Sequence, residues 1–208
     1  MKEIRRSHDL SAQDKQLQTA AAASLRKAEE LLRLDERLPA ILKGESQPAD
    51  ADERLALAEM CLKYKGLPVS AFRFYARCFD EKPQLVDDLD AGYLYNAACA
   101  ATLAGCSQGK DADQLDGKER ARLRQQALGW LRSDLSAWGK LMERAPDKTR
   151  QVLSRTMRHW QKDMDFAGVR GEGLNKLPEA ERHNWQRLWH DVEILHQRAA
   201  EPAKKAGS

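Results

Sequence analysis

The segment GCSQGKDADQLDG, residues 105–117, is where this sequence comes closest to an ion-binding or phosphate-binding loop. Asp111 and Asp113 fit the first and third ligand positions of a calcium loop. The next acid, Asp116, comes one residue too late, and Arg122 stands where such a loop needs its bidentate glutamate. As a phosphate loop, the segment has its glycines one residue too close together, Asp111 in place of Ser or Thr, and no strand before it. We therefore expect a solvated loop that caps the following helix.

Histidine and cysteine side chains could bind a metal, but their spacing does not favour one. His183, His190 and His196 fall on one predicted helix, and no two of them have the four-residue spacing of the HExxH zinc motif. No two cysteines form a CxxC pair; they stand at positions 61, 78, 99 and 106. We expect them to be small buried residues in a reducing compartment. We predict a non-enzymatic protein with no catalytic residue, no metal and no cofactor.

The bulk composition is that of a soluble protein. Of the 208 residues, 32% are charged, and the mean hydropathy is −0.71. No apolar run approaches the ~20 residues that span a bilayer. The N-terminal segment has basic residues but lacks the apolar region of a signal peptide. We expect a cytoplasmic protein that does not bind membranes.

The two halves of the chain differ in charge. Residues 1–115 hold 16 Lys and Arg against 19 Asp and Glu, whereas residues 116–198 hold 17 against 12. Arg120, Arg122 and Arg124 of a predicted helix could bind an acidic peptide or a phosphate, although a solvated face is the simpler interpretation. The basic excess is small for a nucleic-acid-binding domain, so nucleic-acid binding is only a remote alternative.

Helix-forming residues dominate the sequence, and no segment alternates between polar and apolar residues over the length of a strand. We therefore predict an all-α protein in which glycine and proline separate the helices. The expected helices are 11–37, a short turn from Pro39 to Gly44, then about 50–65, 68–82, 89–104, 118–144, 146–161 and 178–199. Residues 162–176 are expected to form a glycine-bearing connection, and residues 201–208 a disordered tail.

Residues 52–85 fit the 34-residue tetratricopeptide (TPR) pattern, in which two antiparallel helices pack closely through small residues. Gly66 falls on the turn glycine, and Pro83 falls on the final proline. Ala71 and Tyr75 take the small and the large positions of the second helix, where the aromatic ring fills the space beside the small residues. Two further positions of the pattern are taken by Ala58 and Cys78.

The segment YLYNAACAATLAG, residues 93–105, fits the first helix of a second repeat, with Gly105 as its turn. Its small uncharged side chains would let neighbouring helices come close. The second helix of this repeat is delayed by an inserted loop at 106–117, and then places Ala127 and Leu131 in the small and large positions. The alternative is a generic alanine-rich core helix.

These features predict one all-helical domain over residues 1–200. It would be a short right-handed α-solenoid of TPR-like antiparallel helix hairpins with capping helices. Residues 1–49 would form a long helix and cap, residues 50–145 the two hairpins, and residues 146–200 a C-terminal helix pair. Caps are needed because two repeats are fewer than the three or so that a solenoid usually requires.

Long stretches of the sequence resemble the C-terminal segment of large bacterial serine/threonine protein kinases that carry TPRs. The resemblance is carried by YNAACAATLAGCSQGKDADQLDGKERARLRQQALGWLRSDLSAW, residues 95–138. It continues through HWQKDMDFAGVRGEGLNKLPEAERHNWQRLWHDVEIL, residues 159–195, and covers roughly residues 34–198. The shared motifs belong to a scaffold and include no catalytic residue.

The chain departs from those kinases because it carries no catalytic domain: it has no glycine-rich loop, no VAIK-like lysine, no HRD and no DFG. The resemblance implies a TPR-type interaction role, in a free-standing relative of the kinase tail or a detached piece of it. It implies a protein or peptide partner, with a serine/threonine kinase as one candidate.

The inner groove of a TPR is lined by the first helix of each repeat. Our candidate partner-binding residues on these helices are Met60, Lys63, Tyr95, Asn96 and Thr102. The five tryptophans of the C-terminal half are expected to pack in the core, with a partner groove as the alternative. The predicted function is a non-enzymatic protein–protein interaction module, an adaptor or scaffold. The alternative is an accessory or regulatory part of bacterial serine/threonine kinase signalling that acts in trans, and the oligomeric state stays open.

Overall fold

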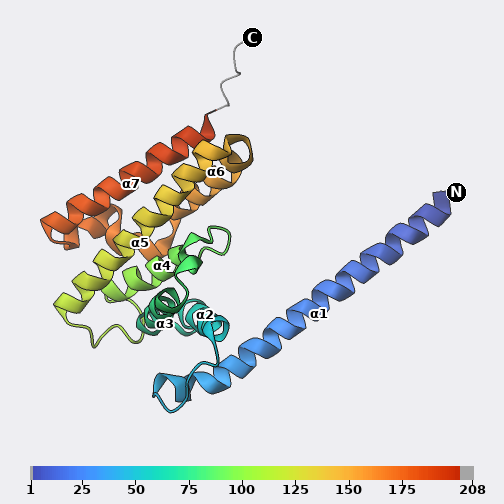
Figure 1. Cartoon of the computed structure of the whole chain (residues 1–208), viewed down its shortest axis with the longest axis horizontal. Helices are drawn as coiled ribbons and strands as arrows, with labels where there is room; N and C mark the ends of the chain where they lie inside the picture. The colour runs from blue at the N-terminus through green and yellow to red at the C-terminus, as the bar shows by residue number, and fades with distance from the viewer. Residues whose placement is uncertain (1, 202–208) are drawn as a thin grey trace, which may run out of the picture. The chain divides into compact units, whose positions relative to one another are not determined.

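The computed structural model describes the backbone of residues 2–201 and the side chains of residues 17–201 (Figure 1). This part of the chain is all-α and contains no strand, which confirms the predicted fold class. The predicted tail at 201–208 lies outside the described residues except for Glu201. The chain forms two compact units, Met1–Pro48 and Ala49–Ser208.

The first unit is a single long helix, α1 (Lys2–Leu42), followed by a turn. The sequence predicted a helix that ends near Arg37 and a separate turn that starts at Pro39, but Pro39 lies within the last turn of α1. A proline removes one N–H donor and crowds the turn before it, yet α1 continues through Pro39 to Leu42. Gly44, in a left-handed conformation with φ +79°, follows the helix and redirects the chain.

The second unit begins with a hairpin of α2 (Ala51–Met60), continued by the turn η1 (Cys61–Lys65), and α3 (Pro68–Glu81). Asp50 caps α2 by accepting a hydrogen bond from Glu53 N at 2.8 Å, since an Asp three residues before a Glu favours this cap. Gly66 then reverses the chain with φ +66°, a conformation that residues with a Cβ rarely adopt. Pro68 starts α3, at a position where a helix needs no N–H donor.

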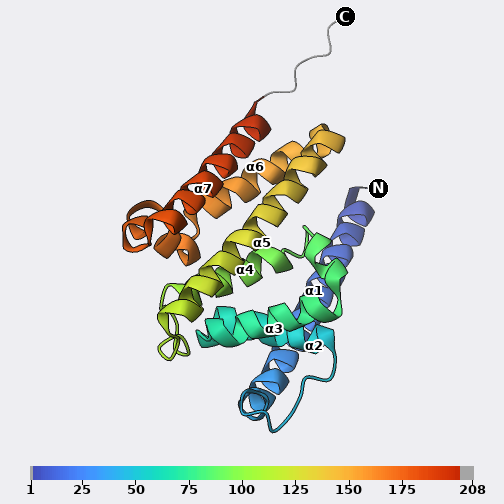
Figure 2. The same ribbon diagram turned by 60° about the vertical axis from the view of Figure 1, so that its left-hand side comes forward.

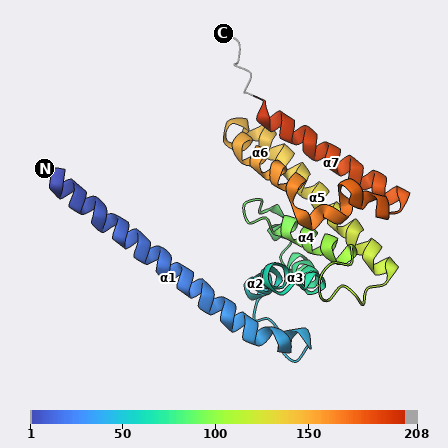
Figure 3. The ribbon, with the colours of Figure 1, turned by 180° about the vertical axis from the view of Figure 1, so that it is seen from behind.

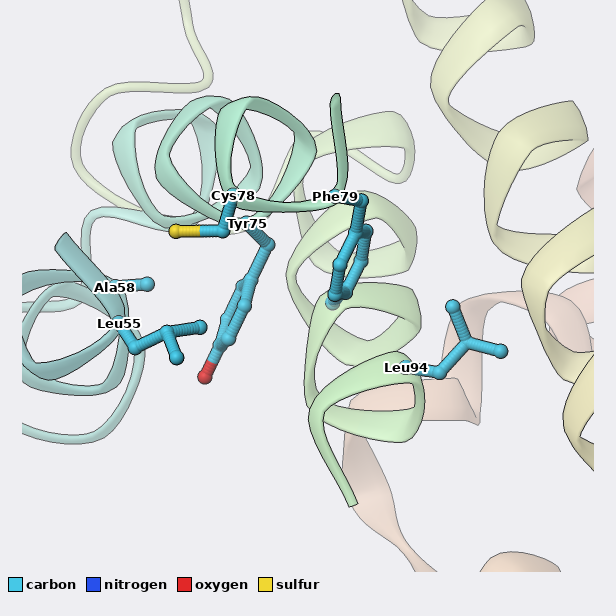
Figure 4. Packing of buried hydrophobic residues seen from close by; sticks show 7 residues of the cluster. Leu55, Ala58, Tyr75, Cys78, Phe79 and Leu94 are labelled. Carbon is cyan, nitrogen blue, oxygen red and sulfur yellow. The ribbon is translucent and has the colours of Figure 1, made fainter. Parts of the chain in front are cut away.

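Buried residues of α2, α3 and α4 (Tyr93–Gly105) form one core cluster (Figure 4). Tyr75 of α3 is 1% exposed, and its ring extends toward Leu55 and Ala58 of α2. Ala71 and Cys78, which the TPR pattern assigns to small positions, and Ala58, which takes its leucine position, have no exposed area. These small side chains leave the space that the Tyr75 ring occupies.

The short turn η2 (Pro83–Asp87) leads to α4, which packs against α3 on one side and against α5 (Gly117–Arg144) on the other. At Gly105 the helices α4 and α5 approach closely, because a Cβ there would lie 2.7 Å from Arg124 Cγ and 2.9 Å from Arg120 O. The small side chains of α4 allow this helix to lie between two neighbours.

The loop between α4 and α5 caps two helices. The Asp111 carboxylate accepts hydrogen bonds from Val69 N at 3.1 Å and from Ser70 N at 2.9 Å, at the start of α3. Asp116 and Glu119 form a capping box at the start of α5, which confirms the predicted cap. The role of Asp111 was not predicted, because it lies 41 residues from Ser70 in the sequence.

The last helices are α6 (Pro146–Lys162) and α7 (Glu179–Ala200). The connection predicted at 162–176 consists largely of two 3₁₀ turns, η3 (Met164–Val169) and η4 (Gly171–Lys176), and η3 packs against α4. Figures 2 and 3 show α5, α6 and α7 side by side, with α4 between α5 and the α2–α3 hairpin. Segments distant in sequence thereby meet around α4.

Candidate partner-binding pocket

The five predicted groove residues do not share one surface. Met60 is 3% exposed and Thr102 has no exposed area, so neither side chain can contact a partner. Lys63 is exposed on η1 and pairs with a glutamate one turn earlier, at 2.6 Å. Tyr95 and Asn96 are half-buried, and both line one pocket. The TPR pattern indicates which face of a hairpin is inner. It does not indicate which later segment covers that face, and in this structure η3 packs on α4.

The pocket has a volume of about 460 Å³ and lies between α4, α5 and α6. Its walls combine four aromatic rings, one acid and the amide of Asn96, which can both donate and accept hydrogen bonds. The lining residues are Leu89, Gly92, Tyr95, Asn96, Asp134, Trp138, Arg155, Thr156, His159 and Trp160. A mostly apolar pocket with a few convergent polar groups is typical of binding sites.

Tyr95 is held in the pocket wall by contacts with α6 and η3. Its hydroxyl donates a hydrogen bond to Asp163 Oδ2 at 2.5 Å. Its ring stacks on Trp160 with centroids 5.3 Å apart and meets the edge of Phe166 at 5.6 Å. Burial, followed by the nearby Cys99 and Asp163, raises the pKa of Tyr95, so the hydroxyl keeps the proton that it donates. These contacts make Tyr95 a fixed part of the wall.

Asp134 of α5 has the most unusual surroundings in the pocket. Its side chain is 4% exposed, and within the described part of the chain no side chain or backbone group forms a hydrogen bond or ion pair with it. Burial raises its pKa to about 7, because the charged form loses its hydration. The carboxyl group therefore changes between its neutral and charged forms near neutral pH. Sequence reasoning missed this residue.

Two basic side chains of α6 also reach the pocket. Arg155 is exposed, and among the described residues it has no hydrogen-bond or ion-pair partner. His159 is exposed too, and its ring lies 5.6 Å from the Tyr95 ring, centroid to centroid. The His159 Nε2 atom is 3.4 Å from Asp163 Oδ2, an ion pair only when the imidazole is protonated. The pocket thus carries both signs of charge.

Two of the five tryptophans belong both to the core and to the pocket wall, while Trp130 and Trp189 are half-buried. Trp138, Trp160 and Trp185 are 5%, 1% and 1% exposed, as expected for core packing of the C-terminal helices. Trp138 and Trp160 also form part of the pocket wall. Trp138 and Trp160 therefore pack in the core and line the pocket at the same time.

One group of described side chains near Tyr95 could hold a metal ion. Cys99, Asp163 and Asp165 offer ligand atoms that lie within 4.8 Å of one another, and a thiol with two carboxylates can bind zinc. Burial raises the pKa of the Cys99 thiol well above its usual value. Burial and the neighbouring Asp163 also raise the pKa of Asp165. Both shifts favour the protonated forms, which bind metals poorly.

A second cavity, of about 560 Å³, lies between the end of α4, the start of α5 and η4. Arg124 lines it and is tied into the fold: it donates to both carboxylate oxygens of Glu181 in α7, at 2.7 and 2.8 Å, and to Gly105 O at 2.6 Å. The solvated face predicted for this helix is therefore wrong for Arg124. Arg120, Lys176 and Glu172 also line the cavity, so its wall carries both signs of charge.

None of the helices in the described part of the chain combines the length and the hydrophobicity that a bilayer crossing requires. Comparison of the chain with protein-family models, with curated proteins and with solved structures finds no match.

Proposed function

We propose that this chain is a TPR-like protein-interaction module that binds a peptide segment of a partner protein in the pocket between α4, α5 and α6. The observation that carries the proposal is the pocket itself, which joins Tyr95 and Asn96 of a predicted repeat helix to aromatic rings of α5 and α6. Aromatic residues in pockets are the usual anchors of protein interfaces. The Asn96 amide can pair with the backbone of a bound peptide.

The packing of α2 and α3 supports the TPR-like part of the proposal. Gly66 occupies the turn in a left-handed conformation. Ala71 and Cys78 are fully buried where the pattern requires small residues, and Ala58 is fully buried at its leucine position. The Tyr75 ring packs in one cluster with Ala58 and Cys78. In the proposed scheme α4 and α5 are the next hairpin, and α6 and α7 close the array.

A peptide-display selection on the full chain tests the proposed function. We expect an enriched motif whose affinity falls at least about tenfold when Asn96→Arg or Thr156→Arg fills the pocket, a loss of roughly 1.4 kcal/mol. Gln126→Arg adds the same charge at an exposed position of α5 outside the pocket, and it should leave the affinity unchanged. A circular-dichroism spectrum of each variant checks that it folds. The proposal is wrong if no motif is enriched, or if all variants bind equally.

Serine/threonine kinases are the first partner class to test, because of the resemblance to kinase tails. In this alternative the chain is an accessory part of kinase signalling that acts in trans. The expected result is a kinase that co-purifies with the full chain and whose activity changes when the purified chain is added. A partner set without kinases would favour a general adaptor instead.

The arginines of α5 argue against nucleic-acid binding as the function. Arg124 pairs with Glu181, and the Arg122 guanidinium lies over the Phe72 ring at 5.9 Å. Positive groups that are engaged within the protein contribute less to phosphate binding. We expect no affinity that falls steeply with salt in a filter-binding assay, which is the signature of phosphate contacts.

A further inference from the structure

We propose that the pocket between α4, α5 and α6 receives a lysine or arginine side chain of the partner peptide, with Asp134 as its counter-ion and the aromatic rings as its walls. This inference rests on the proposed function, since it specifies the chemistry of the peptide that the pocket binds. Asp134 carries this inference, because it is buried, lines the pocket and has no partner among the described residues.

Asp134 lies on the buried side of α5, where Leu131 and Trp138 are also buried. A buried carboxylate is stable in its charged form only when a cation or several hydrogen-bond donors compensate it. Among the described residues no such group reaches Asp134. Asp134 lines the pocket, so an ammonium or guanidinium group that enters the pocket would supply the missing partner.

The aromatic walls suit the same ligand. Tyr95, Trp138 and Trp160 line the pocket together with Asp134. Cations are attracted to the faces of aromatic rings, and more strongly when they are removed from water. The long apolar stem of lysine or arginine would contact the rings while the charged group reaches the carboxylate. A carboxylate at an aromatic wall therefore matches both parts of such a side chain.

Other positively charged groups that face the pocket compete with an incoming cation for Asp134. Arg155 of α6 lines the pocket and has no ion-pair partner among the described residues, so it competes with an incoming cation. His159 of α6, when protonated, would add positive charge on the same side. From α4 the titratable group is Tyr95, whose hydroxyl stays neutral and bonds to Asp163. Arg155→Gln should therefore strengthen cation binding.

The test uses the full chain and five-residue peptides, blocked at both ends, with alanine at four positions and lysine, arginine or norleucine at the centre. Norleucine keeps the apolar stem of lysine and lacks its charge. Binding is followed by NMR through the indole N–H signals of the tryptophans, of which Trp138 and Trp160 line the pocket. At pH 8 we expect the lysine and arginine peptides to bind at least about tenfold more tightly than the norleucine peptide.

Two changes should remove this preference. Asp134→Asn is expected to bring the three peptides to the same affinity, whereas Asp147→Asn, an exposed acid of α6 outside the pocket, should leave the preference intact. Lowering the pH from 8 to 6 should weaken lysine binding about tenfold, because a carboxyl group with a pKa of about 7 is then mostly neutral. Equal affinity of the three peptides for the wild-type protein overturns the inference.

The design separates failure of this inference from failure of the proposed function. If display selects a motif that needs Asn96 but has no basic residue and binds Asp134→Asn normally, the interaction module stands and the cation site is wrong. If display yields no motif while butylammonium and methylguanidinium still shift the pocket indoles in an Asp134-dependent manner, the cation site stands and the peptide function is wrong.

Discussion

Replacing Asp134 with asparagine should stabilise the protein at alkaline pH and have little effect at acid pH. Burial raises the pKa of Asp134 from 3.8 to about 7 in the folded state. Between these two values the folded protein holds a proton on this group and the unfolded chain does not. The folded state then binds more protons, so the free energy of unfolding falls as the pH rises through this window and is constant above it. Asparagine carries no charge, so its burial makes no pH-dependent contribution to the free energy of unfolding.

The size of the effect follows from the shift. A difference of about three pH units corresponds to roughly 4 kcal/mol at ~1.4 kcal/mol per unit, and it acts on a side chain that is 4% exposed. Most of the window lies between pH 5 and pH 8. As the pH rises across that range, the free energy of unfolding of the wild-type protein should fall by about 2–3 kcal/mol relative to that of Asp134→Asn.

Urea unfolding of both proteins at half-unit steps from pH 4.5 to pH 8.5 measures this difference. Other acids titrate in both proteins, including Asp165, and cancel in the comparison. Asp147→Asn controls for the loss of one negative charge at an exposed position. If the stability gap between wild type and Asp134→Asn does not change with pH, Asp134 is solvated or paired in solution, and the argument for the cation site loses its basis.

Other substitutions test the packing of the second unit. Gly105→Ala should destabilise the protein by about 1–3 kcal/mol, because the new Cβ would lie 2.7 Å from Arg124 Cγ. Gly129 is an exposed position of α5 where a Cβ would meet nothing within 4 Å, so Gly129→Ala should instead stabilise the protein by about 0.5–1 kcal/mol. Equal urea midpoints for the two variants would contradict the close approach of α4 and α5. Tyr75→Ala should cost about 3–5 kcal/mol, measured in the same way, since it leaves a cavity in the α2–α3–α4 core. Arg124→Ala should cost about 1–3 kcal/mol through the lost bonds to Glu181 and the Gly105 carbonyl. A double-mutant cycle with Glu181→Ala should give a total below the sum of the single effects, and additivity would show that the pair is not coupled.

The helices could be predicted from sequence where their ends are set by neighbouring residues. Gly66 and Pro68 separate α2 and η1 from α3, and Asp116 caps α5 three residues before Glu119. Each of these signals acts within one turn of the chain. Pro39 misled the prediction because a proline usually ends or kinks a helix, whereas α1 continues three residues beyond it.

The site could not be assembled in the same way, because its contacts join distant segments. The Tyr95 hydroxyl meets Asp163, 68 residues away in sequence. Which face of α4 is covered depends on η3, and nothing in the sequence of α4 encodes that. Tyr95 and Asn96, which are neighbours in the sequence, both line the pocket, while the burial of Met60 and Thr102 depends on tertiary packing.

Asp134 is the exception, because its signal was local. Ala127, Leu131 and Trp138 follow the helical spacing of a buried face, and Asp134 falls between the last two of them in the same register. A charged residue inside an apolar stripe either is paired by another element or marks a place where something else must supply the pair. The structure provides a pocket at that point and no partner among the described residues. The sequence pattern and the pocket, which are independent observations, therefore converge on the same residue as the one that determines what the pocket can bind.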